Sequence, residues 1–216
     1  RMKKHSLARR RFLQSAATIA IVPAAVLGRA QSAPSNRLTV GLIGAGGRGT
    51  GVMNSFLGEK DAQVIGVCDP YETHFRDQTA GRAFGWKPAA ELVGRRYKTK
   101  PCAHYADYRE LCARKDLDIV IIGTPDHWHA VQTLEALRNG KDVYCEKPVT
   151  HFFAEGQAVY REVAKRKAIF QTGSQQRSDH RFRLAVEIVR NGLLGDIKEV
   201  QVGLPGGTHN DNGDTT

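Results

Sequence analysis

A cluster of glycines directly behind an apolar run constrains the fold of this chain more than any other feature. Residues 38–43 are apolar enough for a buried strand, and the sequence GAGGRG at positions 44–49 leads from them into a helix-like segment. Glycine lets a strand turn sharply, lets the backbone approach a pyrophosphate, and lets the next helix pack tightly. We therefore expect a dinucleotide-binding turn at a helix N-terminus. The residues assigned to it are Gly44, Gly46, Gly47, Arg48 and Gly49.

Asp69 supports this interpretation. A second apolar run, residues 62–68, ends at Asp69, which lies twenty positions beyond Gly49 (69 − 49 = 20). A carboxylate at this spacing binds the ribose hydroxyls and repels the additional phosphate of NADP. The pattern therefore favours NAD over NADP, although Arg48 or Arg76 could compensate for the charge of a phosphate. The other interpretation of Asp69 is a solvent-exposed turn residue before Pro70.

Alternating strand and helix patterns predict an α/β fold with a doubly wound parallel sheet. The run at 118–122 is almost continuously apolar, as a central strand buried on both faces should be. Residues 85–101 carry glycine, proline and basic residues, and we expect a surface insertion there, before a short strand at 102–104. The main strands are expected near 38–43, 62–68, 118–122, 141–145 and 168–172, and the helices near 47–57, 71–84, 105–115, 127–139 and 153–167.

The residues that follow two of these strands are candidates for chemistry. Ligands of doubly wound sheets bind at the carboxyl ends of the strands, so Thr124, Pro125, Glu146 and Lys147 should face the cofactor. Lys147 is the leading catalytic candidate, because an ammonium there can polarise a substrate hydroxyl or carbonyl. Glu146 could position that ammonium or contact the nicotinamide ribose. The alternative is an ordinary surface Lys-Glu pair.

His127 and His129 flank Trp128 and follow Asp126. Polar side chains this close together at a helix start rarely converge on one ion, so we expect no metal site. For His129 we expect a contact with cofactor or substrate, and a capping or packing histidine is the alternative.

The first thirty residues are predicted to be an export signal. Arg9, Arg10 and Arg11 precede an apolar stretch at 12–28 that no acidic residue interrupts. The arginine run resembles the twin-arginine consensus, which predicts a bacterial periplasmic protein with no stable membrane span after signal removal. An uncleaved anchor is the alternative, but the seventeen residues from 12 to 28 include a proline and span a bilayer poorly.

The same segment accounts for most of the positive charge. It holds seven of the 32 basic residues and none of the 22 acidic ones, so the remainder carries only 25 − 22 = +3. So mild a balance does not predict a nucleic-acid partner. The cysteines lack paired C-x-x-C spacing and give no zinc signature. Cys68 and Cys145 are expected to be buried thiols, and a disulfide between Cys102 and Cys112 stays an alternative in an oxidising compartment.

Residues 173–216 are predicted to begin a second domain. An amphipathic helix is expected from Arg181 to about residue 191, and alternation at 197–202 predicts a strand. Too few residues follow to build a complete substrate domain, so we expect the truncated start of an α+β domain. Its Gln175, Gln176 and Arg177 offer a polar wall suited to hydroxyls or a carboxylate, unless they are plain loop residues.

In order and spacing, these motifs resemble the Gfo/Idh/MocA oxidoreductase family, and the leader and residues 173–178 resemble its exported branch. The segments that carry the resemblance are residues 44–49, 68–69, 124–129 and the Glu-Lys-Pro triplet at 146–148.

The resemblance implies a Rossmann-type domain over residues 37–172 and a nicotinamide-dependent dehydrogenase or reductase acting on sugars, cyclitols or their derivatives. Lys147 matches the family's catalytic lysine. The Asp-x-x-x-His pair that the family carries on a second-domain helix does not follow Lys147 in this sequence, and the family's usual homo-oligomer interface would lie in the missing part of that domain. Two alternatives stay open: a glycosidase that oxidises its sugar transiently with bound NAD, whose triplet tends to lack the lysine, and a non-catalytic nucleotide-binding protein.

Overall fold

The computed structural model describes residues 36–75, 81 and 83–203. The predicted export signal at 1–30 and Arg76 lie outside the described residues. The chain divides into two units, of which the first ends at Gly173 and the second begins at Ser174.

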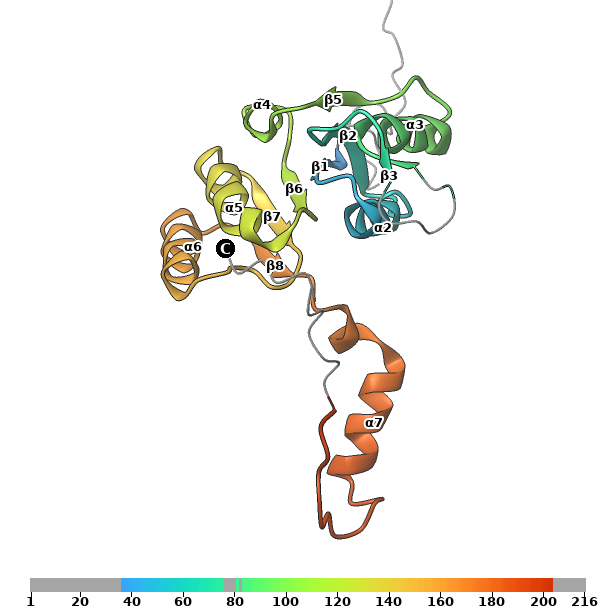
Figure 1. The fold of residues 1–216 in the computed structure, drawn as a ribbon, viewed down its shortest axis with the longest axis vertical. Helices are drawn as coiled ribbons and strands as arrows, with labels where there is room; N and C mark the ends of the chain where they lie inside the picture. The colour runs from blue at the N-terminus through green and yellow to red at the C-terminus, as the bar shows by residue number, and fades with distance from the viewer. Residues whose placement is uncertain (1–35, 76–80, 82, 204–216) are drawn as a thin grey trace, which may run out of the picture. The chain divides into compact units, whose positions relative to one another are not determined.

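A six-stranded parallel sheet forms the first unit, in the order β5-β2-β1-β6-β7-β8 (Figure 1). From β1 the chain adds β2 and β5 on one side and then β6, β7 and β8 on the other. Ligands of doubly wound sheets bind where the strand order reverses, which here is between β1 and β6. The predicted Rossmann-type α/β fold is confirmed. The strands are β1 (Leu38–Ile43), β2 (Ala62–Cys68), β5 (Ala103–Tyr105), β6 (Ile119–Ile122), β7 (Asp142–Cys145) and β8 (Phe170–Thr172).

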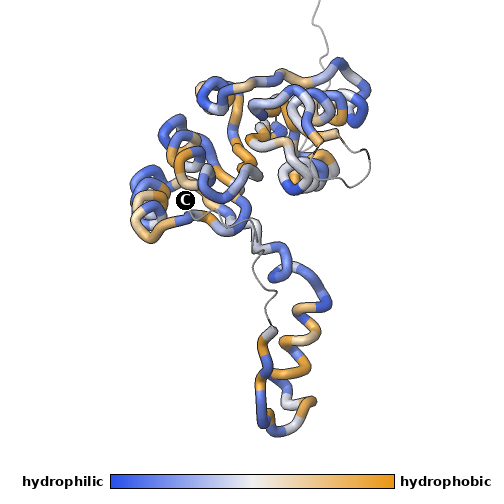
Figure 2. Tube along the Cα trace, viewed as in Figure 1, coloured by the Kyte–Doolittle hydropathy of each residue, from blue (hydrophilic) through white to orange (hydrophobic). Residues whose placement is uncertain are grey.

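Helices cover both faces of the sheet. Successive residues of a strand point to opposite sides, so each strand gives apolar side chains to both helical layers. Leu42 and Ile121 pack in one buried cluster with α2 and α3, whereas Ile43 and Ile122 pack in a second cluster with α4 and α5. Hydrophobic residues therefore line β6 between the two groups of helices (Figure 2). The helices of this unit are α2 (Gly47–Phe56), α3 (Trp86–Tyr97), α4 (Tyr108–Cys112), α5 (His129–Arg138) and α6 (Phe153–Arg166).

The helix predicted at 71–84 is wrong. The described part of that range forms two short antiparallel strands, β3 (His74–Phe75) and β4 (Ala83–Phe84). The residue after β4, Gly85, donates a backbone hydrogen bond to the Ala45 carbonyl at 3.1 Å, so this segment packs against the glycine turn. That long-range contact, which local propensity cannot reveal, decides the conformation here.

The surface insertion predicted at 85–101 is wrong as well. Helix α3 occupies most of that range and buries Ala89, Ala90 and Val93 against the sheet. Pro88 falls in the first turn of α3, where the N–H that proline lacks has no partner within the helix, so the proline does not break it.

All four cysteines are free thiols, so the Cys102–Cys112 disulfide is not formed. Burial raises the pKa of Cys68, Cys112 and Cys145 to about 12 and the pKa of Cys102 to about 11. Buried thiols of this kind behave as small apolar side chains.

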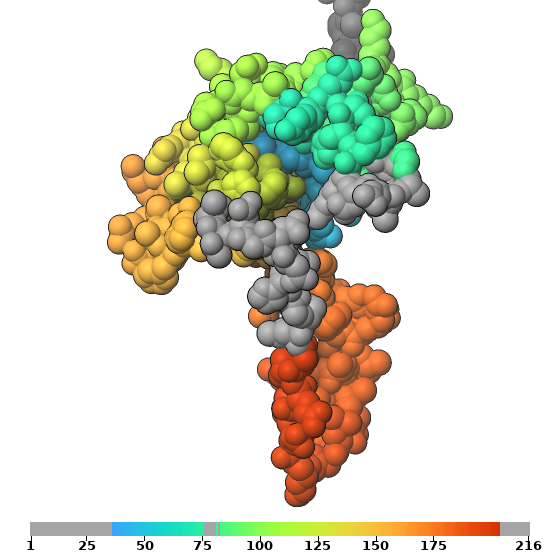
Figure 3. Space-filling view, viewed as in Figure 1, coloured from blue at the N-terminus to red at the C-terminus, as the bar shows by residue number. Residues whose placement is uncertain are grey.

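The second unit contains the 3₁₀ turn η3 (Gln175–Ser178) and helix α7 (His180–Arg190). The helix expected from Arg181 is confirmed, and Asp179 caps it by accepting a hydrogen bond from the Arg181 amide at 2.8 Å. The strand predicted at 197–202 is wrong, because these residues have no regular secondary structure. The backbone groups of a strand must pair with a neighbouring strand, and the described residues of this unit include none. Figures 1 and 3 show this segment running back alongside α7. The assignment to an α+β substrate domain stays a prediction.

Within the described ranges, no helix has the length and apolar character needed to cross a bilayer. The same residues contain no cluster of three or more side chains suited to hold a metal ion.

Candidate cofactor and catalytic site

The glycine turn between β1 and α2 leaves no room for side chains at two of its positions, Gly44 and Gly49. A Cβ on Gly49 would lie 1.9 Å from the Gly44 carbonyl oxygen, and Gly44 itself has φ of +87°. A Cβ on Gly123, at the end of β6, would lie 2.6 Å from the Gly49 Cα, so strand and helix touch at the switch point. By contrast, nothing lies within 4 Å of a Cβ placed on Gly46. The turn is thus packed tightly on its inner side and open at Gly46, as the approach of a pyrophosphate requires.

Asp69 lies beside this turn and is nearly buried, with 6% of its surface exposed. Its Oδ2 accepts a hydrogen bond from the Ala45 amide at 2.9 Å, and its Oδ1 accepts one from the Tyr71 amide at 3.0 Å. Each carboxylate oxygen can accept a second hydrogen bond. The carboxylate is therefore fixed in place next to the phosphate turn and keeps acceptor capacity for ribose hydroxyls.

Arg48, in the first turn of α2, forms an ion pair with Glu146 at the end of β7. Its Nη2 lies 2.6 Å from Glu146 Oε1, and the exposed fraction is 44% for the Arg48 side chain but only 5% for that of Glu146. The pair raises the pKa of Arg48. Apart from this ion pair, the buried Oε1 has no hydrogen-bond donor among the described residues. A Cβ on Gly173 would lie 2.5 Å from the same oxygen, so a glycine is needed to make room for this carboxylate.

Tyr144 is a member of this cluster that the sequence analysis missed. Burial and the negative charge of Glu146 raise the pKa of the Tyr144 hydroxyl, while the charge of Arg48 lowers it. Because side chains alternate along a strand, Tyr144 and Glu146 lie on the same face of β7. That period-2 relationship is the signal that could have identified Tyr144.

Lys147 follows Glu146 and is exposed. Its backbone amide lies 3.4 Å from Glu146 Oε2, and the peptide bond between Lys147 and Pro148 is cis. The ammonium group is thus accessible at the carboxyl end of β7, next to a carboxylate that is buried.

Thr124 and Pro125 follow β6 and lead into the 3₁₀ turn η2 (Asp126–Trp128). The Thr124 hydroxyl donates to Gln132 Oε1 of α5 at 2.8 Å. His129 begins α5 and is only 2% exposed, and its ring nitrogens lie 2.5 Å from the Pro148 carbonyl oxygen and 2.9 Å from that of Thr124. Both nitrogens are thus engaged by backbone, and a cofactor or substrate contact by His129 stays a prediction.

Backbone hydrogen bonds join the ends of neighbouring strands and bring these loops together. Gly44 donates to Cys68, Gly123 to Ile43 and Glu146 to Ile122, at 2.9, 2.9 and 3.0 Å. The predicted site residues of the first unit therefore share one edge of the sheet. The predicted substrate residues Gln175, Gln176 and Arg177 lie in η3 of the second unit.

A dinucleotide fits what this edge provides. The inner glycines make the close turn, open Gly46 lies at the N-terminus of α2, and the α2 N-cap supplies no side chain that would occupy the first amides. The buried carboxylate of Glu146, paired with Arg48, lies nearby and can accept a further hydrogen bond. Backbone amides at a helix start suit phosphates, and carboxylates suit ribose hydroxyls.

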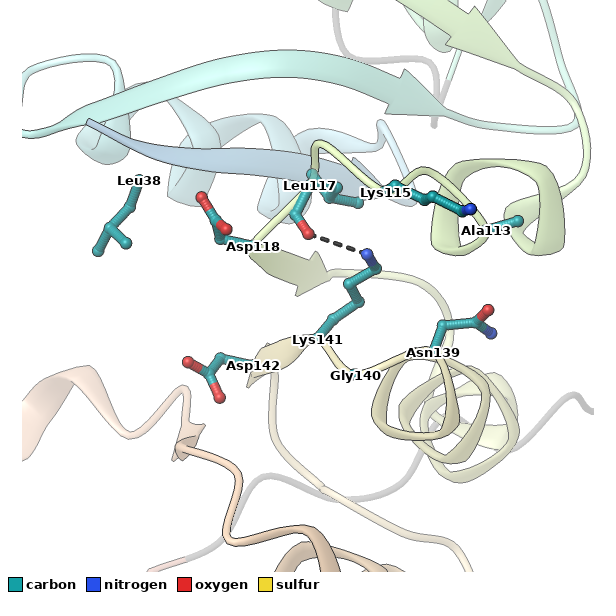
Figure 4. Close-up of a pocket in the computed structure, with 9 residues that line it drawn as sticks. All are labelled: Leu38, Ala113, Lys115, Leu117, Asp118, Asn139, Gly140, Lys141 and Asp142. Carbon is teal, nitrogen blue, oxygen red and sulfur yellow. Dashed lines mark hydrogen bonds between the residues drawn. The ribbon is translucent and has the colours of Figure 1, made fainter. Parts of the chain in front are cut away.

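A separate hollow of about 610 Å³ opens at the opposite edge, where the strands begin (Figure 4). Lys141 lines it, is 6% exposed, and donates to the carbonyl oxygens of Arg114 and Leu117 at 2.5 and 2.9 Å. Its ammonium is therefore engaged by backbone carbonyls, and we assign this hollow no part in the site.

The chain is similar in sequence to several known proteins. The chain is 26% identical to an alpha-N-acetylgalactosaminidase from Shewanella oneidensis over 161 residues, which cover 73% of this chain and 33% of that protein. It is also 26% identical to an inositol 2-dehydrogenase from Rhodococcus jostii, with coverage of 76% and 40%. The chain thus spans roughly a third to two fifths of these relatives.

Solved structures share the fold. The scyllo-inositol dehydrogenase from Lactobacillus casei, solved with bound NAD(H) and scyllo-inositol, matches with a TM-score of 0.59 at 20% identity and covers 74% of this chain and 43% of that one. The profile of the oxidoreductase family with an NAD-binding Rossmann fold matches residues 38–174. That range exceeds half of the sequence and includes the glycine turn, Asp69 and the Glu-Lys-Pro triplet, and the chain therefore belongs to the Gfo/Idh/MocA oxidoreductase family.

Proposed function

We propose that this chain is the cofactor-binding part of an NAD-dependent oxidoreductase that acts on a sugar, a cyclitol or a derivative of one. The observation that carries the proposal is the position of Lys147, exposed at the carboxyl end of β7 directly after a buried Glu146 that is paired with Arg48 of the glycine-turn helix. The lysine is thereby linked to the segment that would hold the pyrophosphate.

Each residue then has a definite task. The amides that follow Gly46 would bind the pyrophosphate, and Asp69 would accept hydrogen bonds from the adenosine ribose. The nicotinamide, when bound, supplies hydride transfer. The Lys147 ammonium would donate a hydrogen bond to the reacting oxygen of the substrate and so stabilise negative charge that develops there. Gln175, Gln176 and Arg177 remain our candidates for binding hydroxyl groups of the substrate.

Titration of the 216-residue chain with NAD and with NADP tests the cofactor assignment. We expect NAD to quench protein fluorescence at lower concentration than NADP, because Asp69 opposes a second phosphate on the ribose. Binding of neither nucleotide by the folded chain would refute the proposal. A screen of sugars and cyclitols for NAD reduction by protein that includes a complete substrate domain then tests the reaction.

A glycosidase is the second candidate, because the Shewanella relative carries that activity in its name and is as similar to this chain as the inositol dehydrogenase. In that reaction the NAD is regenerated within each turnover. Release of the sugar's substituent without accumulation of reduced cofactor would favour the glycosidase. Accumulation of NADH with an intact substituent would favour the dehydrogenase. Nucleotide binding without either reaction would favour a non-catalytic protein.

We also propose export by the twin-arginine route to the periplasm and assembly as a homo-oligomer. Substituting lysine for both Arg9 and Arg10 in a reporter fusion should retain the reporter in the cytoplasm. Continued export of that fusion would favour the general secretory route or an anchor. Light scattering of protein that includes a complete substrate domain tests the oligomer, and a monomeric mass would refute it.

A further inference from the structure

His129 lies where the two loops of the candidate site meet. It is the first residue of α5, and 2% of its surface is exposed. One of its contacts reaches the loop after β6, at Thr124, and the other reaches the loop after β7, at Pro148. The two loops are far apart in sequence, and this buried ring touches both.

The chemistry of these contacts shows what the ring does. Both partners are backbone carbonyl oxygens, which can only accept, so the imidazole must be the donor. A neutral ring carries one N–H and donates to one of the two oxygens at a time, whereas a protonated ring donates to both. Nδ1 lies 2.5 Å from the Pro148 oxygen and Nε2 lies 2.9 Å from the Thr124 oxygen, both within hydrogen-bond range. An apolar side chain of the same volume would fill the space but donate to neither.

The position of Lys147 gives these contacts a function. Its neighbour on one side, Glu146, is paired with Arg48 of α2, and its neighbour on the other, Pro148, contacts His129 of α5. The exposed lysine is therefore held between two anchored residues that are connected to helices on opposite faces of the sheet. Small displacements of a catalytic group cost much of its effect, so support of this kind matters.

We propose that His129 is a positioning residue, which holds the Lys147 loop to the Thr124 loop and so fixes Lys147 relative to the bound cofactor. This inference rests on the proposed function, because the position of Lys147 matters for catalysis only if a nicotinamide binds beside it. Both ring nitrogens of His129 contact backbone carbonyl oxygens, so the role assigned to it acts through Lys147.

A matched pair of variants separates hydrogen bonding from space filling. His129→Gln keeps a side-chain N–H donor, whereas His129→Met has similar size and length but no donor. His127→Gln is the control, since His127 is exposed, its ring lies 3.8 Å from an Asp126 oxygen, and it makes a tilted contact with Trp128. Circular dichroism shows whether each variant is folded.

Lysines labelled by reductive ¹³C-methylation report the position of Lys147, whose NMR signal is assigned with Lys147→Arg. We expect NAD to shift this signal in the unmodified chain and in His127→Gln, to shift it less in His129→Gln, and to leave it unshifted in His129→Met. NAD affinity is measured for each variant by titration, and the shift of the Lys147 signal is compared at saturating NAD, so that loss of position is separated from loss of binding. Equal behaviour of the Gln and Met variants, or a normal shift in His129→Met, would overturn the proposal.

Amide hydrogen exchange gives a readout that does not depend on NAD. The amides of Glu146 and Lys147 should exchange faster in His129→Met than in His129→Gln. If the unmodified chain binds no NAD, the proposed function fails. The exchange comparison still tests whether His129 connects the two loops through hydrogen bonds. Equal exchange in the two variants would mean that hydrogen bonds from residue 129 do not hold the loops together.

Discussion

Asp69 accepts a hydrogen bond from the backbone amide of Ala45, so the carboxylate assigned to the ribose also stabilises the glycine turn. The N–H···O distance is 2.9 Å, and a second amide, that of Tyr71, binds the other oxygen. We therefore expect cofactor preference and stability of the turn to depend on one side chain.

We predict that Asp69→Ala lowers the free energy of unfolding by about 1–3 kcal/mol, because it leaves a buried amide without an acceptor. Asp69→Asn keeps one acceptor oxygen and should cost less. Both variants should bind NAD more weakly and discriminate less against NADP, since both remove the charge. Urea unfolding and nucleotide titration measure the two effects. Tighter binding of NADP than NAD by the unmodified chain would mean that other residues, such as Arg48, determine the cofactor preference.

The glycine turn predicts opposite outcomes for two neighbouring substitutions. Gly49→Ala places a Cβ 1.9 Å from the Gly44 carbonyl oxygen and should destabilise the chain by about 3 kcal/mol or more. Gly46→Ala meets nothing within 4 Å and should fold normally. It should nevertheless weaken NAD binding, because the new methyl group occupies the side open to the pyrophosphate. Equal NAD affinity in Gly46→Ala and the unmodified chain would show that the phosphates approach elsewhere.

The elements around this site were the most predictable from sequence. The predicted bounds of β1 and β2 agree with the structure, and β6, β7 and β8 begin within two residues of their predicted starts. The central strand β6 is an unbroken apolar run, as expected of a parallel strand buried on both faces. Because the carboxyl ends of parallel strands lie at one edge of the sheet, these strands also predict that Thr124 and Lys147 lie at the same edge. Local pattern was sufficient wherever a segment is buried on both faces.

Local pattern failed where contacts distant in sequence decide the conformation. Phe84 lies against the glycine turn, 3.4 Å from the Cβ position of Gly47, and Gly85 hydrogen-bonds to Ala45. Neither contact can be read from the residues at 71–85. The same applies to the site, because the Arg48–Glu146 pair joins residues 98 positions apart (146 − 48 = 98) and the two acceptors of His129 are backbone atoms.

The Arg48–Glu146 pair should be measurable as an energetic coupling. Arg48→Met leaves the carboxylate of Glu146 buried without its cation, and we expect a loss of about 1–3 kcal/mol. This is less than the value for a fully buried pair, because solvent screens the half-exposed guanidinium. Adding Glu146→Gln should restore much of that loss, since no buried charge remains. A double-mutant cycle in urea gives the coupling, and additive losses would mean that the pair contributes nothing.

The cysteines should resist alkylation in the folded protein. The thiolate is the reactive form, and a pKa of about 12 for Cys68, Cys112 and Cys145 leaves almost none of it at neutral pH. Cys102, with a pKa of about 11 and partial exposure, should react first. Reactivity should rise as the pH approaches 11, and all four thiols should react promptly in denaturant. Mass spectrometry after iodoacetamide treatment counts them, and fast labelling of Cys68 at neutral pH would contradict its burial.

Lys147 provides the most direct test of catalysis. In protein that turns over a sugar or cyclitol substrate, Lys147→Ala should lower turnover by on the order of 10²-fold or more, the usual scale for a positioned acid-base group. Cofactor affinity should stay almost intact, because an ammonium that polarises the reacting oxygen acts mainly in the transition state. Lys147→Arg should not restore turnover, since a guanidinium is bulkier and does not readily give up a proton. Steady-state kinetics beside NAD titration separates the two effects, and normal turnover in Lys147→Ala would reduce Lys147 to a surface lysine of the loop after β7.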